Sequence, residues 1–211
     1  MPGAMSAAEE RAAMVERLAA RGITDERVLA AMAEVPRERF VPADVAADAY
    51  ADMPLPIGSD QTISAPWIVA FSIEVLGIGL AGTALEIGTG SGYAAAVLSR
   101  CCRTVVTVER HPGLAERARV VLAELGRDNV EVRTGDGTAG APDCAPFDGI
   151  VVTAMAEDDV PAALLEQLAP DGTLVCPVGH KGSGSLVRHR AGRREDLLDV
   201  AFVPLVTGNP D

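Results

Sequence analysis

The chain has 211 residues, carries a net charge of −12 (18 Lys and Arg against 30 Asp and Glu) and is 48% hydrophobic but only 3% aromatic. At ~150 residues per domain, this length favours a single domain with a core built from aliphatic side chains. The acid excess argues against a nucleic-acid partner, because binding to phosphates needs clustered Lys and Arg.

Membrane and secreted classes are also disfavoured. The apolar stretches are interrupted well before the ~18 residues that a membrane span needs, and the N-terminus lacks the order of a secretory signal. The four cysteines form no C-x-x-C pair and lie near no histidine at metal-ligand spacing; they are Cys101, Cys102, Cys144 and Cys176. We therefore expect reduced thiols, no metal site, no membrane partner and a cytoplasmic location, with a monomer favoured and the oligomeric state open.

Residues 1–78 are predicted to form a helical and irregular appendage. Ser6 and Glu9 have capping-box spacing before a helix over 7–21, and Thr24 is a candidate cap for a second helix that reaches Ala33. Prolines then exclude regular helix, and the stretch around 54–58 is predicted to be irregular. Ser64 is a candidate N-cap for a helix over 68–76. Either Met1 or Met5 could be the native start.

From Thr83 onward, strands and helices alternate, which predicts a Rossmann-like, doubly wound sheet with mostly parallel strands and a cofactor-binding core over 79–179. The predicted strands are 83–87, 104–109, 130–134, 149–152 and 174–177, and the predicted helices are 93–99, 114–125 and 162–167. The tail over 180–211 alternates apolar and basic residues around Gly192. It predicts antiparallel strands at one sheet edge, the last over 201–204.

The sharpest motif follows the first of these strands, where Gly88, Gly90 and Gly92 alternate with other residues. Such glycines let the backbone turn tightly and approach a ligand at the carboxyl edge of the sheet. A dinucleotide fingerprint needs glycine where Tyr93 stands, and the Walker A motif is absent, so an NAD-linked oxidoreductase is disfavoured. A non-catalytic nucleotide-binding module stays open.

The segment from Glu86 to Gly92 resembles the E-x-G-x-G-x-G signature of class I S-adenosylmethionine methyltransferases. Glu109 ends the next strand, 23 residues after Glu86, where an acid can accept ribose hydroxyls, and Asp136 with Gly137 follows the third strand, where such enzymes hold adenine. The resemblance implies S-adenosylmethionine as cofactor. The residues expected to bind it are Thr62, Ile63, Glu86, Gly88, Thr89, Gly90, Gly92, Glu109, Arg110, Asp136 and Gly137.

Further blocks make the resemblance specific. Together with the glycine motif, the sequence from about 14 to 206 resembles protein-L-isoaspartate O-methyltransferases; the blocks are IGSDQTISAP at 57–66, VER at 108–110, GDGT at 135–138, FDGIVVTA at 147–154 and FVPL at 202–205. The resemblance implies methyl transfer to the α-carboxylate of isoaspartyl residues in proteins and peptides, which initiates repair. It aligns Ser64 with the catalytic serine and implies a substrate site at Ser64, Thr153, Ala154 and Met155.

The chemistry agrees with the residues present. A carboxylate of pKa ~4 is already ionised at pH 7, so the reaction needs no general base. The segment 155–159 departs from the family pattern with three consecutive acids after Ala156, and acids that pointed inward would repel a carboxylate substrate. A dedicated enzyme that methylates an ordinary aspartate in one peptide, to form an aspartimide, is therefore an open alternative.

Overall fold

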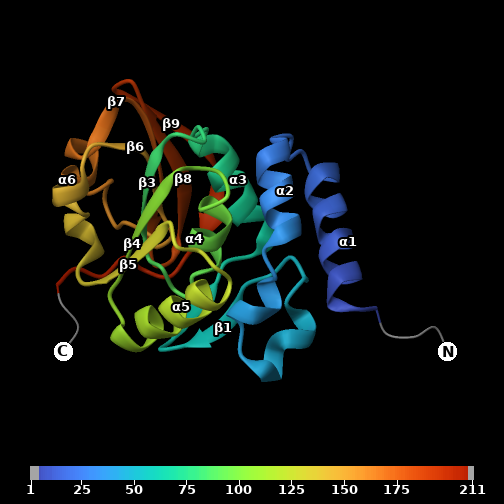
Figure 1. The fold of residues 1–211 in the computed structure, drawn as a ribbon. Helices are drawn as coiled ribbons and strands as arrows, with labels where there is room; N and C mark the ends of the chain where they lie inside the picture. The colour runs from blue at the N-terminus through green and yellow to red at the C-terminus, as the bar shows by residue number, and fades with distance from the viewer. Residues whose placement is uncertain (1–4, 209–211) are drawn as a thin grey trace.

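A seven-stranded sheet organises the computed structural model, which describes residues 5–208 (Figure 1). The strand order is β5-β4-β3-β6-β7-β8-β9; β3 to β7 are parallel and β8 and β9 are antiparallel. The strands are β3 (Thr83–Ile87), β4 (Thr104–Glu109), β5 (Val130–Thr134), β6 (Phe147–Val152), β7 (Leu168–His180), β8 (Ser183–Arg190) and β9 (Arg193–Ala201). The predicted Rossmann-like sheet with an antiparallel edge is confirmed. Residues 1–4 and 209–211, which include Met1, lie outside the described part.

Alternate residues of each central strand pack into two separate hydrophobic clusters, one on each face of the sheet. Ala84 and Val105 belong to the cluster shared with α3 (Pro66–Leu76), α4 (Tyr93–Leu98) and α5 (Pro112–Glu124). Leu85 and Val106 belong to the cluster that contains Leu164 of α6 (Ala162–Glu166) on the other face. Burial on both faces explains why the strands are nearly continuous aliphatic runs.

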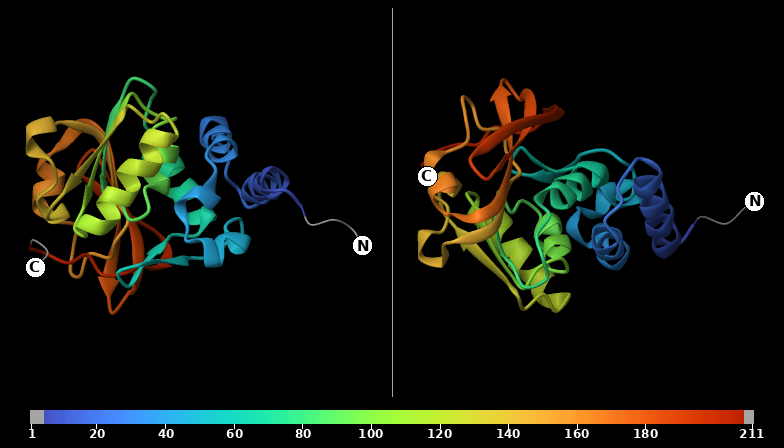
Figure 2. Two further views of the ribbon diagram at one scale, coloured as in Figure 1. Left: turned by 60° about the horizontal axis from the view of Figure 1, so that its bottom comes forward. Right: turned by 90° about the horizontal axis from the view of Figure 1, so that it is seen from above.

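Two N-terminal helices, α1 (Ala7–Ala20) and α2 (Glu26–Glu34), lie beyond α3 and away from the sheet (Figures 1 and 2). The capping box of Ser6 and Glu9 is confirmed, but the cap predicted at Thr24 is wrong. Asp25 caps α2, because the amide and hydroxyl of Thr24 both donate instead to Glu74 Oε1, at 2.6 and 3.0 Å.

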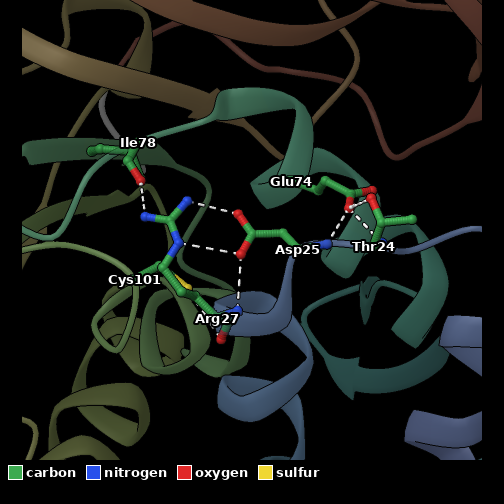
Figure 3. A network of polar contacts seen from close by, with 6 residues as sticks. All are labelled: Thr24, Asp25, Arg27, Glu74, Ile78 and Cys101. Carbon is green, nitrogen blue, oxygen red and sulfur yellow. Dashed lines mark hydrogen bonds and ion pairs between the residues drawn. The ribbon is translucent and has the colours of Figure 1, made fainter.

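Glu74 therefore fastens α2 to α3 (Figure 3). Its Oε1 also accepts from the amide of Asp25 at 2.6 Å, while Arg27 pairs with Asp25 and donates to the carbonyl of Ile78 at 2.8 Å. One carboxylate oxygen thus accepts hydrogen bonds from the backbone amides of Thr24 and Asp25, which have no acceptor within the helix. This contact holds α2 on a helix that lines the site described below.

Replacing Glu74 with Ala should lower the free energy of unfolding by about 1–3 kcal/mol, because two backbone amides lose their acceptor. Glu74→Gln keeps a carbonyl oxygen at the same place and is the matched control, with a smaller expected loss. Urea unfolding of both variants measures the difference. Equal stability of Glu74→Ala and the parent chain would contradict the assigned role.

The stretch predicted to be irregular before Ser64 contains a hairpin of β1 (Leu55–Gly58) and β2 (Gln61–Ile63). Ser59 and Asp60 connect the strands with φ of 54° and 55°, the signs that a type I′ turn requires. The sequence prediction missed this hairpin because such turns favour Asn-Gly over Ser-Asp.

The tail also differs from the prediction in the position of its last strand. β9 ends at Ala201, so the strand predicted over 201–204 is wrong; among the described residues that follow, up to 208, Pro204 alone makes a bridge, to Met155. Among residues 5–208, no helix is long and apolar enough to cross a membrane.

Candidate active site

The glycine loop after β3 turns sharply at the carboxyl edge of the sheet. Gly88, Gly90 and Gly92 have φ of 93°, 53° and 90°, in the left-handed region that favours glycine. A Cβ on Gly88 would lie 2.4 Å from Oγ1 of Thr153, and that hydroxyl donates to the Gly88 carbonyl at 2.6 Å. Thr153, predicted as a substrate residue, therefore also holds the loop from β6.

Three neighbouring cavities lie at this edge of the sheet, and Thr62 and Thr153 line all of them, whereas the glycine loop lines the first two. The loop cavity lies against the glycine loop and α3; its lining includes Ile63, Ser64, Ser72, Gly88, Thr89 and Tyr93. The acidic cavity lies at the ends of β3 and β4; its lining includes Gln61, Glu109, Arg110, Gly137 and Ala154. The outer groove lies along β9; its lining includes Pro54, Ser64, Trp67, Asp199 and Phe202.

Glu109 is only 4% exposed and faces the acidic cavity. Its Oε2 accepts from the amide of Gly90 and its Oε1 from the amide of His111, each at 2.8 Å. Each carboxylate oxygen keeps further acceptor capacity, so the group can bind hydroxyls while it holds the loop.

Glu86 lies beneath the loop rather than in it. Its side chain is fully buried and lines none of the three cavities. Thr107 Oγ1 donates to Oε2 at 2.6 Å and shares a 2.6 Å hydrogen bond with Oγ1 of Thr89, which does line the loop cavity. Burial raises the pKa of Glu86 to about 8, against the lowering effect of the bond from Thr107. Glu86, predicted to bind the cofactor, therefore connects to the loop cavity only through two threonines.

Asp136 is engaged by its own turn and by the tail. Oδ1 accepts from the amide and hydroxyl of Thr138, and Oδ2 accepts from the amide of Gly208 at 2.6 Å. Partial burial opposes ionisation, but these bonds outweigh it and lower the pKa of Asp136. Arg110 donates to the carbonyls of Thr207 and Gly208 at 2.9 and 2.6 Å. Both predicted cofactor residues thus fix the tail.

The tail forms a wall of the acidic cavity, which the sequence prediction missed. Residues 203–206 line that cavity, and the chain is held there by two 2.7 Å backbone bonds between Met155 and the tail residues Val203 and Leu205. The FVPL block at 202–205 is the sequence feature that marks this wall, but its apolar residues favour a strand prediction. Met155, predicted as a substrate residue, is 3% exposed and acts here through its backbone.

Ser64 lies where the loop cavity meets the outer groove. The N-cap predicted for it is wrong: the residue before α3 is Ala65, and no side chain caps this helix. Pro66 occupies the first turn and removes one amide that a cap would serve. Ser64 is thus not required as a helix cap.

The acids after Ala156 face away from the cavities. The carboxylates of Glu157 and Asp158 lie 3.9 and 3.8 Å from His180, and both side chains are more than four-fifths exposed. Asp159 pairs with Arg194 at 3.0 Å. The departure at 155–159 therefore places no carboxylate in the site.

Comparison with known proteins identifies this arrangement. The family model of protein-L-isoaspartate(D-aspartate) O-methyltransferases matches residues 9–210. The chain belongs to this family. Among curated family members, the protein-L-isoaspartate O-methyltransferase of Roseiflexus castenholzii is 53% identical over 209 residues, which cover 97% of this chain and 95% of the relative. That of Methanoregula boonei is 52% identical over 203 residues, with 94% and 93% covered.

Solved structures of the family agree with the fold. One protein-L-isoaspartate O-methyltransferase superposes with a TM-score of 0.84 at 30% identity; it matches 94% of this chain, which covers 66% of that longer chain. A structure from Plasmodium falciparum, described as a protein-L-isoaspartate O-methyltransferase in complex with S-adenosyl-L-homocysteine, has a TM-score of 0.79 at 26% identity and matches 93% of this chain. The family uses S-adenosylmethionine, and the chain is a methyltransferase of that type.

Glu109→Ala should weaken binding of S-adenosylhomocysteine roughly 5- to 150-fold, because a buried acceptor worth about 1–3 kcal/mol is lost. Glu109→Gln keeps the size of the side chain and one acceptor oxygen but sets an NH2 donor against a backbone amide, so its affinity should lie between those of the parent chain and the alanine variant. Calorimetric titration measures both affinities. Tight binding to the alanine variant would remove Glu109 from the cofactor site.

Proposed function

We propose that this protein transfers a methyl group from S-adenosylmethionine to the α-carboxylate of isoaspartyl residues in proteins and peptides of diverse sequence. The position of Ser64 carries the proposal. Ser64 lines both the loop cavity, which lies against the glycine loop, and the outer groove along β9. A serine at that junction can contact a substrate carboxylate next to the cofactor.

The residues of the loop and acidic cavities fit S-adenosylmethionine. The loop cavity offers a glycine backbone and mainly apolar side chains, and the acidic cavity offers the Glu109 carboxylate for hydroxyl groups. When bound, the cofactor supplies an electrophilic methyl group on a sulfonium sulfur. Thr62 and Ile63 of β2, which directly precede Ser64, line the loop cavity.

Ser64 would orient the substrate carboxylate rather than activate it. The carboxylate is ionised at neutral pH, so the site has to hold one of its oxygens in line with the methyl group and to remove no proton. A neutral hydroxyl donates a single hydrogen bond and leaves the anion more nucleophilic than a bound Arg or Lys would. This agrees with the uncharged side chains of Thr62, Ser64 and Thr153 at the junction of the cavities.

The substrate class can be tested with paired synthetic peptides that differ only in having an isoaspartyl or an aspartyl linkage. With tritium-labelled cofactor, we expect labelling of several unrelated isoaspartyl peptides and none of their aspartyl counterparts. Absence of labelling in all isoaspartyl peptides would contradict the proposal and favour a dedicated aspartyl substrate. The outward-facing acids at 157–159 support the general substrate class, because they place no new charge at the site.

We also propose a cytoplasmic location, in keeping with four free cysteines.

A further inference from the structure

Arg37 is a buried charge that the proposed reaction does not use. It lies on the 3₁₀ turn η1 (Arg37–Phe40) of the N-terminal appendage, and its side chain is 0% exposed. Nε donates to the carbonyl of Ala49 at 2.7 Å, but Nη1 and Nη2 have no hydrogen-bond partner among the described residues. Burial lowers the pKa of Arg37 to about 10, so the group still carries its charge at neutral pH.

Stability alone does not account for an arginine here. Burying a guanidinium with two unpartnered nitrogens is costly, and an apolar side chain of similar length would avoid that cost. The compensating contact is with an aromatic ring: the guanidinium carbon lies 4.9 Å from the ring centroid of Tyr93. Such cation–π contacts gain strength when both groups are desolvated, and Tyr93 is itself only 1% exposed.

The Tyr93 ring connects the appendage to the glycine loop. Tyr93 directly follows Gly92, begins α4 and lines the loop cavity. Its ring forms a T-shaped pair with the ring of Phe40, with centroids 5.6 Å apart, and its hydroxyl lies 3.5 Å from the sulfur of Met32. Arg37, Phe40 and Met32 all belong to the appendage, so three contacts from one segment fix the residue where the loop enters its helix.

We propose that Arg37 is a positioning residue for the cofactor site, acting through the Tyr93 ring to hold the glycine loop and the wall of the loop cavity. Loss of this contact lets the ring shift and loosens the loop that surrounds the cofactor. The inference depends on the binding of the cofactor and not on the identity of the methylated substrate. A binding experiment therefore tests it independently of the peptide assay.

The decisive variant is Arg37→Met, which removes the charge and keeps the length of the side chain. We expect its thermal midpoint to stay near or rise above that of the parent chain, while Kd for S-adenosylhomocysteine increases by about 3- to 30-fold, the range of a desolvated cation–π contact. Arg37→Lys keeps the charge but lacks the planar guanidinium, so its Kd should lie between those of the parent chain and Arg37→Met. An affinity of Arg37→Met within twofold of the parent value would overturn the proposal, whatever its stability.

A double-mutant cycle separates positioning from general loosening of the fold. In a Tyr93→Leu background the ring is absent, so Arg37→Met should cause no further loss of affinity. Additive losses would overturn the proposal, because Arg37 would then act by another route. Should Arg37→Met fail to fold, Arg37→Lys in the same two backgrounds completes the cycle with the same two outcomes. Arg39→Met, at an exposed position of the same turn where the side chain pairs with Glu124, is the control, with affinity expected within twofold of the parent.

Discussion

Replacing Ser64 with Ala should reduce turnover on an isoaspartyl peptide by about 10- to 150-fold, the value of one hydrogen bond to a charged group. The affinity for S-adenosylhomocysteine should change little, because the loss concerns the substrate carboxylate. Stability should also change little, because the residue before α3 is Ala65 and no side chain caps that helix. Initial rates, a calorimetric titration and a thermal midpoint on one preparation give all three values.

Ser6→Ala is a matched control for this experiment. Ser6 is a true cap, since its hydroxyl accepts from the amide of Glu9 and the Glu9 carboxylate accepts in return. Its loss should cost about 0.5–2 kcal/mol of stability with unchanged turnover in the folded fraction. We therefore expect Ser64→Ala to lose turnover with little loss of stability, and Ser6→Ala to lose stability with unchanged turnover. A folded Ser64→Ala variant with undiminished turnover would exclude Ser64 from catalysis.

The sheet could be predicted from sequence because its signals are local and repeated. Each central strand is an aliphatic run followed by a helix pattern, and the predicted bounds of β3, β4 and β5 match the observed ones. Long-range contacts were less predictable. Thr24 had the right residue type for a cap, but Glu74, 50 positions away, takes its amide and hydroxyl.

The candidate site shows the same division between local and distant information. The glycine motif and Glu109 were placed correctly at the carboxyl edge because strand ends converge there. The wall at 203–206 could not be placed, because it depends on how the tail returns to Met155 and on bonds from Arg110. Glu86 could be assigned to the motif, but its burial beneath the loop depends on Thr107 of the neighbouring strand.

Glu86→Gln should change the pH dependence of stability. The pKa of Glu86 is about 8 in the folded protein, raised by burial from an ordinary value of 4.5. A raised pKa means that the folded state holds the proton while the unfolded state releases it, so the parent chain loses stability as the pH rises from 4.5 to about 8. Glutamine does not titrate and avoids this loss.

The stability of Glu86→Gln relative to the parent chain should therefore rise between pH 5 and pH 8.5 by a few kcal/mol, which is roughly 4–12 °C in Tm for a chain of this size. The glutamine amide carries one hydrogen more than a protonated carboxyl group. Any packing cost of that hydrogen is the same at both pH values, so it cancels when the two differences in Tm are compared. Glu116→Gln, at an exposed position of α5, is the control and should show no such rise. Because Glu86 reaches the loop cavity only through Thr107 and Thr89, S-adenosylhomocysteine should still bind Glu86→Gln at neutral pH. A pH-independent difference in Tm would mean that Glu86 is ionised beneath the glycine loop, and that Thr107 donates to a carboxylate rather than to a neutral carboxyl group.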